Sequence, residues 1–300
     1  MDICFWNKCN NRCLMCTNPN DFWESNIYTE EFLKKRLAQL ADRDQEGDSI
    51  LLTGGEPTIH PKFLEVLRFI SREYPDRRID LLTNGRRFVY EDFAREVMRV
   101  PNLMVAIPLH GCDAKTHEKI TRSPGSFEQA KKGIANILKF RQNYSGQILE
   151  IRTVISRLNY RQTGKILKMI ADEFPSADRA VVIFLEVEGQ AADNFKTVGL
   201  KYADYQPYFK NLEPFVDKFR EFRLYHFPLC VLPQKLWPYA WRTLPLHEVA
   251  YLPTCRDCRY QDVCLGVHKG YLAQVGSKEF KAIKKEVKIK KTGNFYHPLA

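Results

Sequence analysis

The chain has 300 residues, of which 44% are hydrophobic and 12% aromatic. This supply of apolar side chains is enough for one sizeable core and excludes a generally disordered chain. No apolar run reaches the length that spans a bilayer, and the first residues lack the basic-then-apolar pattern of a signal peptide. We therefore expect a cytoplasmic protein without a transmembrane segment.

The formal net charge of +10 is concentrated near the C-terminus. Eight lysines but only two glutamates lie between residues 266 and 300, so the rest of the chain is nearly balanced. This distribution argues against a phosphate-binding face and against stable binding of nucleic acid. Residues 278–291 interleave apolar side chains with lysines, which predicts a solvated terminal helix. Docking of an acidic leader peptide or contact with a membrane surface is the alternative for this tail.

Short aliphatic and β-branched runs alternate with segments of helical period, which is typical of βα units around a parallel sheet. Thr29 can cap the first helix, and Ser126 to Gln129 reads as a capping box at the start of another. A less regular unit adds a helix over 205–222 and a strand over 223–227. The six principal strands are expected at residues 2–6, 49–52, 78–82, 103–109, 148–155 and 180–187.

The regular alternation stops after Phe227, where five prolines and four cysteines fall within about forty residues. We therefore divide the chain into a core of residues 1–227, a small irregular cysteine-bearing module of residues 228–275, and a basic tail of residues 276–300.

Three cysteines follow the first strand with the spacing C-x3-C-x2-C: Cys9, Cys13 and Cys16. In a reducing compartment, clustered cysteines indicate metal ligands rather than disulfides. Three thiolates on one loop can hold three irons of a cubane and leave the fourth iron open. A zinc knuckle with a further ligand such as Cys4, or a set of unrelated buried thiols, remains the alternative.

Polar or glycine-containing motifs also follow the other expected strands. In parallel βα barrels the chemistry lies at the carboxyl ends of the strands, so these motifs are expected to line one cavity. Adjacent glycines permit close approach of a ligand, and a neighbouring carboxylate can accept hydrogen bonds from an ammonium group. The motifs are Thr53 to Thr58 (TGGEPT), Thr83 to Gly85, Pro108 to Gly111, Arg152-Thr153, and Glu186 to Gly189.

Through the cysteine triad and the Gly-Gly-Glu-Pro motif, residues 1 to about 187 resemble the radical S-adenosylmethionine (SAM) superfamily. The resemblance implies an α/β fold, a partial (β/α)6 TIM-type barrel, in which the three cysteines bind a 4Fe-4S cluster and SAM chelates its fourth iron. It further implies that Gly54, Gly55 and Glu56 orient the SAM amino group, that Asn84, His110 and Arg152 lie near its ribose or carboxylate, and that Val154 lies near the adenine. The family often has serine and aspartate in the fourth-strand motif, where this chain has Pro108 and His110, and a packed core histidine is the alternative for His110.

The chemistry implied by the resemblance is reductive cleavage of SAM to a 5′-deoxyadenosyl radical that abstracts a substrate hydrogen. An external donor of flavodoxin or ferredoxin type is expected to supply the electron. The sequence does not identify a catalytic acid or base.

A second cysteine group, Cys230, Cys255, Cys258 and Cys264, has enough thiolates for a closed site that holds either zinc or an auxiliary 4Fe-4S cluster. Its C-x2-C-x5-C run resembles the SPASM and twitch extensions of radical SAM enzymes, which implies an auxiliary cluster. His268 stands where a full SPASM domain has another cysteine, and it is either a ligand or a packed histidine.

Several further stretches resemble the radical SAM maturase of the His-Xaa-Ser peptide systems: Ile107 to His110, Glu150 to Ile155, Leu185 to Asn194, and Pro228 to Pro233. That resemblance implies an oxidoreductase-type maturase whose substrate is a ribosomally synthesised peptide. The alternatives are a radical SAM enzyme acting on a small molecule (a sugar, nucleoside or cofactor precursor) and a zinc-binding protein without catalysis.

Overall fold

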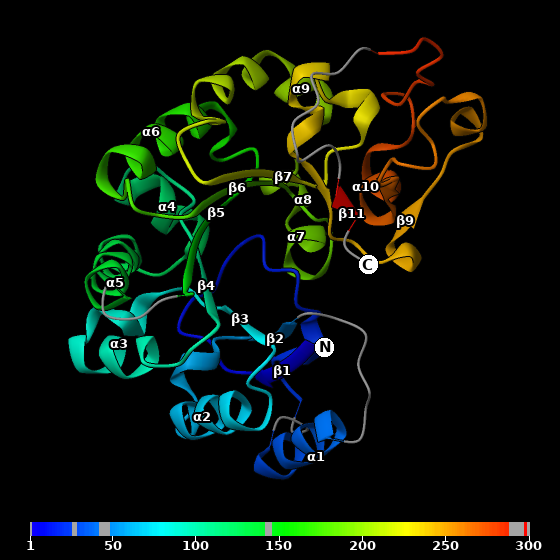
Figure 1. Cartoon of the computed structure of the whole chain (residues 1–300). Coiled ribbons are helices and arrows are strands. Elements are labelled where there is room, and N and C mark those ends of the chain that lie inside the picture. Colours follow the sequence, from blue (N-terminus) through cyan, green and yellow to red (C-terminus); the bar gives the residue numbers. More distant parts are fainter. Residues whose placement is uncertain (1, 26–28, 42–48, 142–145, 288–296, 299–300) are drawn as a thin grey trace.

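The computed structural model describes residues 2–25, 29–41, 49–141, 146–287 and 297–298. Its main feature is one curved sheet of parallel strands in the order β1-β2-β3-β4-β5-β6-β7-β8-β11, with β1 at one edge and β11 at the other (Figure 1). The sheet is thus an open partial barrel. Its strands are β1 (Asp2–Trp6), β2 (Ser49–Gly54), β3 (Arg78–Leu82), β4 (Leu103–Pro108), β5 (Ile148–Ile155), β6 (Arg179–Phe184), β7 (Glu221–Tyr225), β8 (Ala240–Arg242) and β11 (His297–Pro298).

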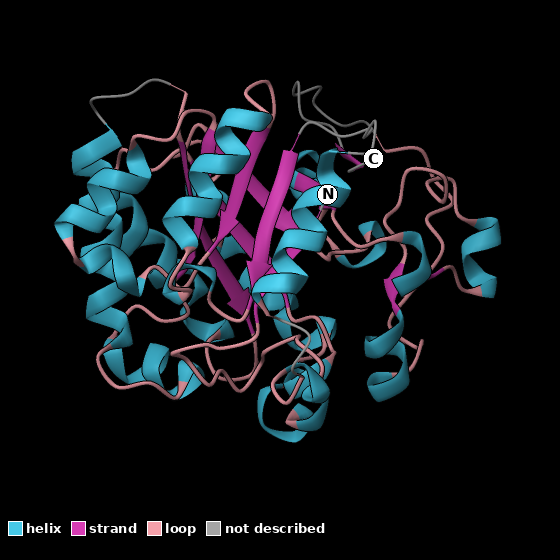
Figure 2. Cartoon of the chain, turned by 90° about the horizontal axis from the view of Figure 1, so that it is seen from below, coloured by secondary structure: helices cyan, strands magenta, loops and turns pink. Residues whose placement is uncertain are grey.

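Helices cover the outer face of the sheet, as Figure 2 shows from below. The helices of the core are α1 (Glu30–Ala41), α2 (Phe63–Glu73), α3 (Glu91–Met98), α4 (Ala114–Thr121), α5 (Ser126–Arg141), α6 (Thr163–Glu173), α7 (Gly189–Asp193), α8 (Phe195–Val198) and α9 (Tyr202–Tyr205). The strands are rich in buried apolar residues, and every residue of β6 is buried, including Arg179 at its start.

The six principal strands confirm the fold predicted from the sequence, and three of them have the predicted bounds: β1, β3 and β5. The predicted seventh strand is β7, which begins two residues earlier than expected. Beyond it, β8 continues the sheet through the pairing of Ala240 with Leu224. The sheet therefore extends past Phe227 into the segment where the regular βα pattern stops.

Two predicted helices are wrong. Residues 205–222 form short pieces, namely the end of α9 and the 3-10 helices η5 (Gln206–Asn211) and η6 (Glu213–Phe215). Pro207 and Pro214 cannot donate the backbone hydrogen bonds of a continuous helix. Residues 278–287 of the tail are also not helical, and residues 288–291 lie outside the described part.

Of the two helix caps predicted from the sequence, the structure has the one at Thr29 but not the one at Ser126. The Thr29 hydroxyl accepts from the Phe32 N–H at 3.3 Å, as expected at the start of α1. Ser126 instead begins α5 itself, and its hydroxyl contacts that of Thr121 at 2.8 Å. The capping box predicted at Ser126 is therefore wrong.

The irregular module after β8 packs beside the open edge of the sheet (Figure 1). Its regular elements are a two-stranded antiparallel ribbon, β9 (Val249–Ala250) with β10 (Val267–His268), and the helix α10 (Lys269–Val275). Among the described residues, no helix is long and apolar enough to cross a membrane.

Candidate functional site

The loop that carries Cys9, Cys13 and Cys16 follows β1 and is fastened along its length by neighbouring backbone. The Arg12 N–H donates to the Thr121 carbonyl at 3.0 Å, and the Leu14 N–H donates to the Ile120 carbonyl at 2.9 Å. These bonds anchor the loop to the end of α4. The position of the three thiols is thus set by the barrel rather than by the loop alone.

All three thiols are half-buried and none forms a disulfide. Burial is the main cause that raises the pKa of each thiol, to about 12 for Cys9. For Cys9 and Cys13, mutual repulsion of the thiolates adds to this effect. A bound cation would reverse this balance, because metal ligation requires the thiolate. The donor set therefore fits a metal cluster, which would supply the missing positive charge.

The two glycines of the strand-end motif bring β2 against the start of the cysteine loop. The Gly55 N–H donates to the Trp6 carbonyl at 2.6 Å, and the Glu56 N–H donates to the Lys8 carbonyl at 2.8 Å. A Cβ at Gly54 would lie 2.6 Å from the Trp6 oxygen, and one at Gly55 would lie 2.4 Å from the Lys8 oxygen. Gly54 also has a φ of +127°, which side chains rarely adopt. Both positions thus require glycine for the close approach to the residues before Cys9.

The Glu56 side chain lies beneath this loop and is only 1% exposed. Its Oε1 accepts from the Thr58 N–H at 3.0 Å and from the Thr83 hydroxyl at 2.7 Å. Its Oε2 accepts from the Asn84 N–H at 2.6 Å. These donors belong to the ends of β2 and β3, so the carboxylate joins two strand ends within the protein.

Asn84 and Arg86 connect the end of β3 to the cysteine loop. The Asn84 Nδ2 lies 4.0 Å from the Cys9 Sγ and donates to the Asn10 Oδ1 at 2.6 Å. The Arg86 guanidinium donates to the Asn10 carbonyl and, at 2.8 Å, to the Asn11 Oδ1. The structure therefore places Asn84 beside Cys9 of the cysteine loop. The sequence analysis missed Arg86, although it follows the Thr83 to Gly85 motif directly.

His110 and Val154 lie at the ends of neighbouring strands but differ in their surroundings. The His110 ring is 5% exposed and stacks on His117 with centroids 5.7 Å apart. Burial lowers the pKa of His110 to about 3, so the ring is neutral. Val154 packs in the same apolar cluster as Met15 of the cysteine loop. Val154 thus lies beside the cysteine loop, whereas His110 has a core environment.

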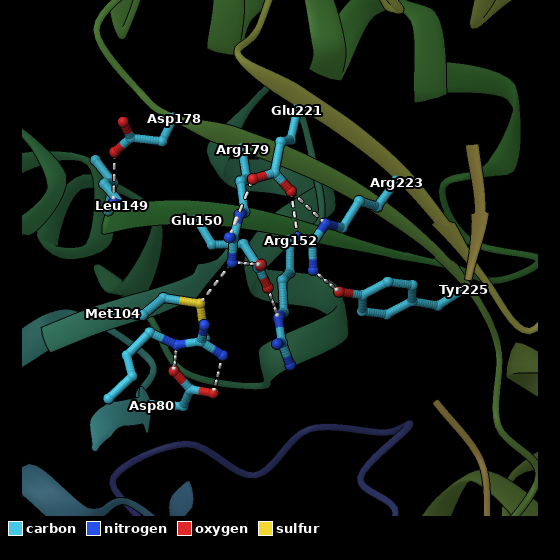
Figure 3. A network of polar contacts seen from close by, with 11 residues as sticks. Asp80, Met104, Leu149, Glu150, Arg152, Asp178, Arg179, Glu221, Arg223 and Tyr225 are labelled. Atoms are coloured by element: carbon cyan, nitrogen blue, oxygen red, sulfur yellow. Dashed lines mark hydrogen bonds and ion pairs between the residues drawn. The ribbon is translucent and has the colours of Figure 1, made fainter. Parts of the chain in front are cut away.

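Arg152 belongs to a network of charged side chains inside the barrel (Figure 3). Its Nε donates to the Glu150 Oε1 at 2.5 Å, and Glu150 is 1% exposed. Glu150 is aligned with Arg179 on β6, and Arg179 with Glu221 on β7, so acidic and basic residues alternate across three strands. Arg179 and Glu221 lie 3.1 Å apart. The Arg152 guanidinium is thus held by Glu150 in this structure.

The second cysteine group also comes together. Cys230, Cys255, Cys258 and Cys264 line one small cavity, which is closed on another side by residues 280–283. Burial raises the pKa of Cys230 to about 12, and the other three thiols of the group add to this effect. His268 is absent from the lining of this cavity, and its Nε2 instead lies 3.1 Å from the Glu188 Oε1.

The sulfurs in both groups are spread apart. In the part of the chain that is described, no three cysteine sulfurs lie within 4.8 Å of one another. Four thiolates around one zinc lie about 3.8 Å apart, since each Zn–S bond is about 2.3 Å.

A parallel partial barrel with three buried thiols after its first strand defines a class of SAM-dependent iron–sulfur enzymes. The family model of the radical SAM superfamily matches residues 3–170, which is more than half of the chain. The chain belongs to this superfamily and is a radical SAM enzyme.

The similar proteins fall into two groups. A probable GTP 3′,8-cyclase of Thermococcus kodakarensis is 27% identical over 214 residues, which cover 70% of this chain and 62% of that protein. Among solved structures, Streptococcus suis SuiB bound to the precursor peptide SuiA has a TM-score of 0.56 at 15% identity, covering 74% of this chain and 48% of SuiB. The enzyme anSMEcpe with bound AdoMet and the Cp18Cys peptide has a TM-score of 0.57 at 20% identity, covering 74% of this chain and 62% of that one. The chain thus spans about half to two thirds of the length of these proteins.

Proposed function

We propose that this radical SAM enzyme modifies a ribosomally synthesised peptide in the cytoplasm. In this proposal Cys9, Cys13 and Cys16 hold the cluster that binds SAM, and the second cysteine group holds an auxiliary 4Fe-4S cluster. Once reduced, a cluster held by these cysteines would supply the electron that cleaves SAM to methionine and a 5′-deoxyadenosyl radical. The observation that carries the proposal is the loop of three buried thiols fastened to the ends of the barrel strands.

The proposed roles of the strand-end residues follow from their contacts. Gly54 and Gly55 bring the backbone beside the cysteine loop, where it can receive the SAM amino group. The Glu56 carboxylate already has internal donors, so we assign it the positioning of Asn84. Asn84 then faces the SAM ribose or carboxylate from beside Cys9, and Val154 faces the adenine.

His110 and Arg152 are less well placed to contact SAM directly. The His110 side chain is buried against His117, and the Arg152 guanidinium is bound by Glu150. We propose that both act on the SAM site through the residues around them. Arg152 reaches SAM only if its bond to Glu150 is exchanged for one to the SAM carboxylate.

An auxiliary iron–sulfur cluster is supported by the C-x2-C-x5-C run of the second cysteine group, and a zinc ion is the alternative. Cys230, Cys255, Cys258 and Cys264 share one cavity. We propose the fourth cysteine, Cys230, as the ligand that closes this site. The auxiliary cluster would then bind substrate or take an electron, and an external donor of flavodoxin or ferredoxin type would reduce the cluster that cleaves SAM.

A peptide substrate is supported by the fold shared with SuiB, solved with its precursor peptide, and with anSMEcpe, solved with the Cp18Cys peptide. A small-molecule substrate is the second candidate, because GTP 3′,8-cyclases are among the relatives found by sequence. That candidate predicts turnover of a purine nucleotide rather than of a peptide.

The clusters are tested by anaerobic iron and sulfide quantification together with electron paramagnetic resonance (EPR) of the dithionite-reduced protein, with and without SAM. We expect about eight irons per chain, falling to about four in the Cys9/Cys13/Cys16→Ala variant. Only the wild type and the matched Cys255/Cys258→Ala variant should show a signal that SAM perturbs. Zinc in place of iron, or no response to SAM, would contradict the proposal.

The substrate is tested by the yield of 5′-deoxyadenosine. The reduced enzyme is incubated with SAM and either a short His-Xaa-Ser-rich peptide encoded beside its gene or GTP. Release above the substrate-free background, with a mass change in the peptide, supports the maturase. Release with GTP alone selects the second candidate.

A further inference from the structure

A group of four metal-ligating side chains lies apart from both cysteine groups. Glu186 and Glu188 follow β6, Glu248 ends the short 3-10 helix η9 (Leu246–Glu248), and His268 ends β10. One ligand atom from each of the four residues lies within 4.8 Å of the others. Ligand atoms about 2.0–2.2 Å from a common metal ion can be at most about 4.4 Å apart, so the group is nearly compact enough to surround one ion.

The group carries three carboxylates without a basic partner from lysine or arginine. Among the described residues, the Glu186 carboxylate has no hydrogen-bond or ion-pair partner, and Glu188 is paired only with His268. Glu248 is paired only with the exposed His247, at 3.6 Å. Burial raises the pKa of Glu186 to about 7, with added repulsion from Glu188 and Glu248. The three acidic groups therefore face one another with too little positive charge between them, and a cation would remove this repulsion.

His268 is the second observation that points to a ligand. Its side chain is only 4% exposed, and its Nε2 faces the Glu188 carboxylate within the group. Its Nδ1 is buried and has no hydrogen-bond partner among the described residues. The two ring nitrogens point to opposite sides of the imidazole, so the Nε2 is the atom that a bound ion would contact, and the Nδ1 lies away from the carboxylates.

The backbone around the group is fixed by close contacts on both sides. Gly270 approaches β6, because a Cβ there would lie 2.1 Å from the Val187 oxygen. Gly189 approaches the loop after Cys16, because a Cβ there would lie 2.1 Å from the Asn18 oxygen. The Ala191 N–H also donates to the Cys16 carbonyl at 3.2 Å. The group thus lies where the barrel, the irregular module and the cysteine loop meet.

We propose that Glu186, Glu188, Glu248 and His268 bind one divalent transition-metal ion such as Mn²⁺, separate from the iron–sulfur sites. Carboxylates with an imidazole are a ligand set for Mn²⁺, Fe²⁺ or Zn²⁺, whereas thiolates suit the softer iron–sulfur chemistry. The ion ties the end of β6 to the ribbon of β9 and β10. This proposal stands independently of the substrate proposed above.

Titration of the iron-loaded enzyme with Mn²⁺ tests the site, because loss of the room-temperature EPR signal of free Mn²⁺ reports binding. We expect one Mn²⁺ per chain for the wild type, displaced by Zn²⁺. The Glu186→Gln/Glu188→Gln variant should bind at least about tenfold more weakly. The Glu91→Gln variant is the matched control, since Glu91 is exposed and pairs with Lys139 on the far side of the barrel.

Two further measurements separate loss of the site from loss of the fold. The single variant Glu248→Gln changes one side chain of the irregular module. It should also weaken Mn²⁺ binding, and its iron content should equal that of the wild type. Mn²⁺ should raise the melting temperature of the wild type and of Glu91→Gln but not of the site variants. Absence of stoichiometric Mn²⁺ binding to the wild type, or equal binding to wild type and both site variants, would overturn the proposal.

Discussion

The carboxylate of Glu56 accepts a hydrogen bond from the backbone N–H of Asn84 at 2.6 Å and so joins the ends of β2 and β3 beneath the cysteine loop. The Glu56→Gln variant replaces one acceptor oxygen with a donor and leaves a buried N–H without its partner. We expect the free energy of unfolding to fall by about 1–3 kcal/mol. The amount of iron bound at Cys9, Cys13 and Cys16 should also fall, because Asn84 contacts the Cys9 sulfur.

A double-mutant cycle with Thr83→Val isolates this network, since the Thr83 hydroxyl donates to the same carboxylate at 2.7 Å. Urea unfolding followed by tryptophan fluorescence under anaerobic conditions gives the four stabilities. A coupling energy of about 0.5–3 kcal/mol is expected for residues in contact. Additive effects of the two substitutions would show that Glu56 does not hold the strand ends together.

The Gly55→Ala variant tests whether the glycines serve the approach to the cysteine loop. Its Cβ would lie 2.4 Å from the Lys8 carbonyl oxygen, so the loop must move and iron occupancy should fall. Gly125→Ala is the control, because its φ of +76° adds strain but its Cβ meets nothing closer than 3.8 Å. We expect Gly125→Ala to cost about 1–2 kcal/mol without loss of iron. Equal iron content in the two variants would contradict this role of Gly55.

The Glu150→Gln variant tests the charged interior of the barrel. Glu150 is 1% exposed and lies 2.5 Å from Arg152 and 3.8 Å from Arg179, so loss of its charge leaves the Arg152 guanidinium without its paired carboxylate. Arg179 keeps its pair with Glu221, so the loss falls mainly on Arg152, and we expect the free energy of unfolding, measured by urea, to fall by about 3 kcal/mol. The exposed pair of Glu91 with Lys139 is the comparison, and Glu91→Gln should change stability little. Similar losses in both variants would argue against a buried network.

Strands with a strong apolar run were predictable to within a few residues, because burial on both faces of a parallel sheet selects continuous β-branched and aliphatic segments. Residues 205–222 were mispredicted, because their apolar spacing suits a helix while Pro207 and Pro214 interrupt its hydrogen bonds. The spacing of apolar residues therefore predicts a helix reliably only where every residue can also donate its backbone hydrogen bond.

Short motifs in the sequence point to single candidate residues, such as Cys9 in the cysteine triad and Asn84 after β3. The internal bonds of Glu56 were not predictable, because its donors Thr83 and Asn84 come from another strand. The group of Glu186, Glu248 and His268 was missed for a similar reason: its members lie as much as eighty residues apart, and only the packing of the module on β6 unites them.

The imidazole of His117 gives the molecule an expected sensitivity to acid. His117 is 2% exposed, and its Nδ1 accepts a hydrogen bond from the His110 backbone N–H at 3.1 Å. Burial is the main cause that lowers its pKa to about 4, and the nearby Arg86 charge adds to it. Because this folded-state pKa lies below the ordinary value of about 6.5, the unfolded chain binds the proton more readily. The free energy of unfolding is therefore unaffected by His117 above pH 6.5. It falls by up to about 3 kcal/mol as the pH is lowered from 6.5 to 4 and the unfolded chain takes up the proton.

The His117→Asn variant removes this titration and keeps an oxygen that can accept from the His110 N–H. Urea unfolding at several pH values between 7.5 and 4.5 should show a shallower loss of stability for the variant than for the wild type. Iron content is measured at each pH, so that release of the clusters by acid is recorded separately. Parallel pH profiles for the two proteins would mean that another group, and not His117, carries the acid sensitivity.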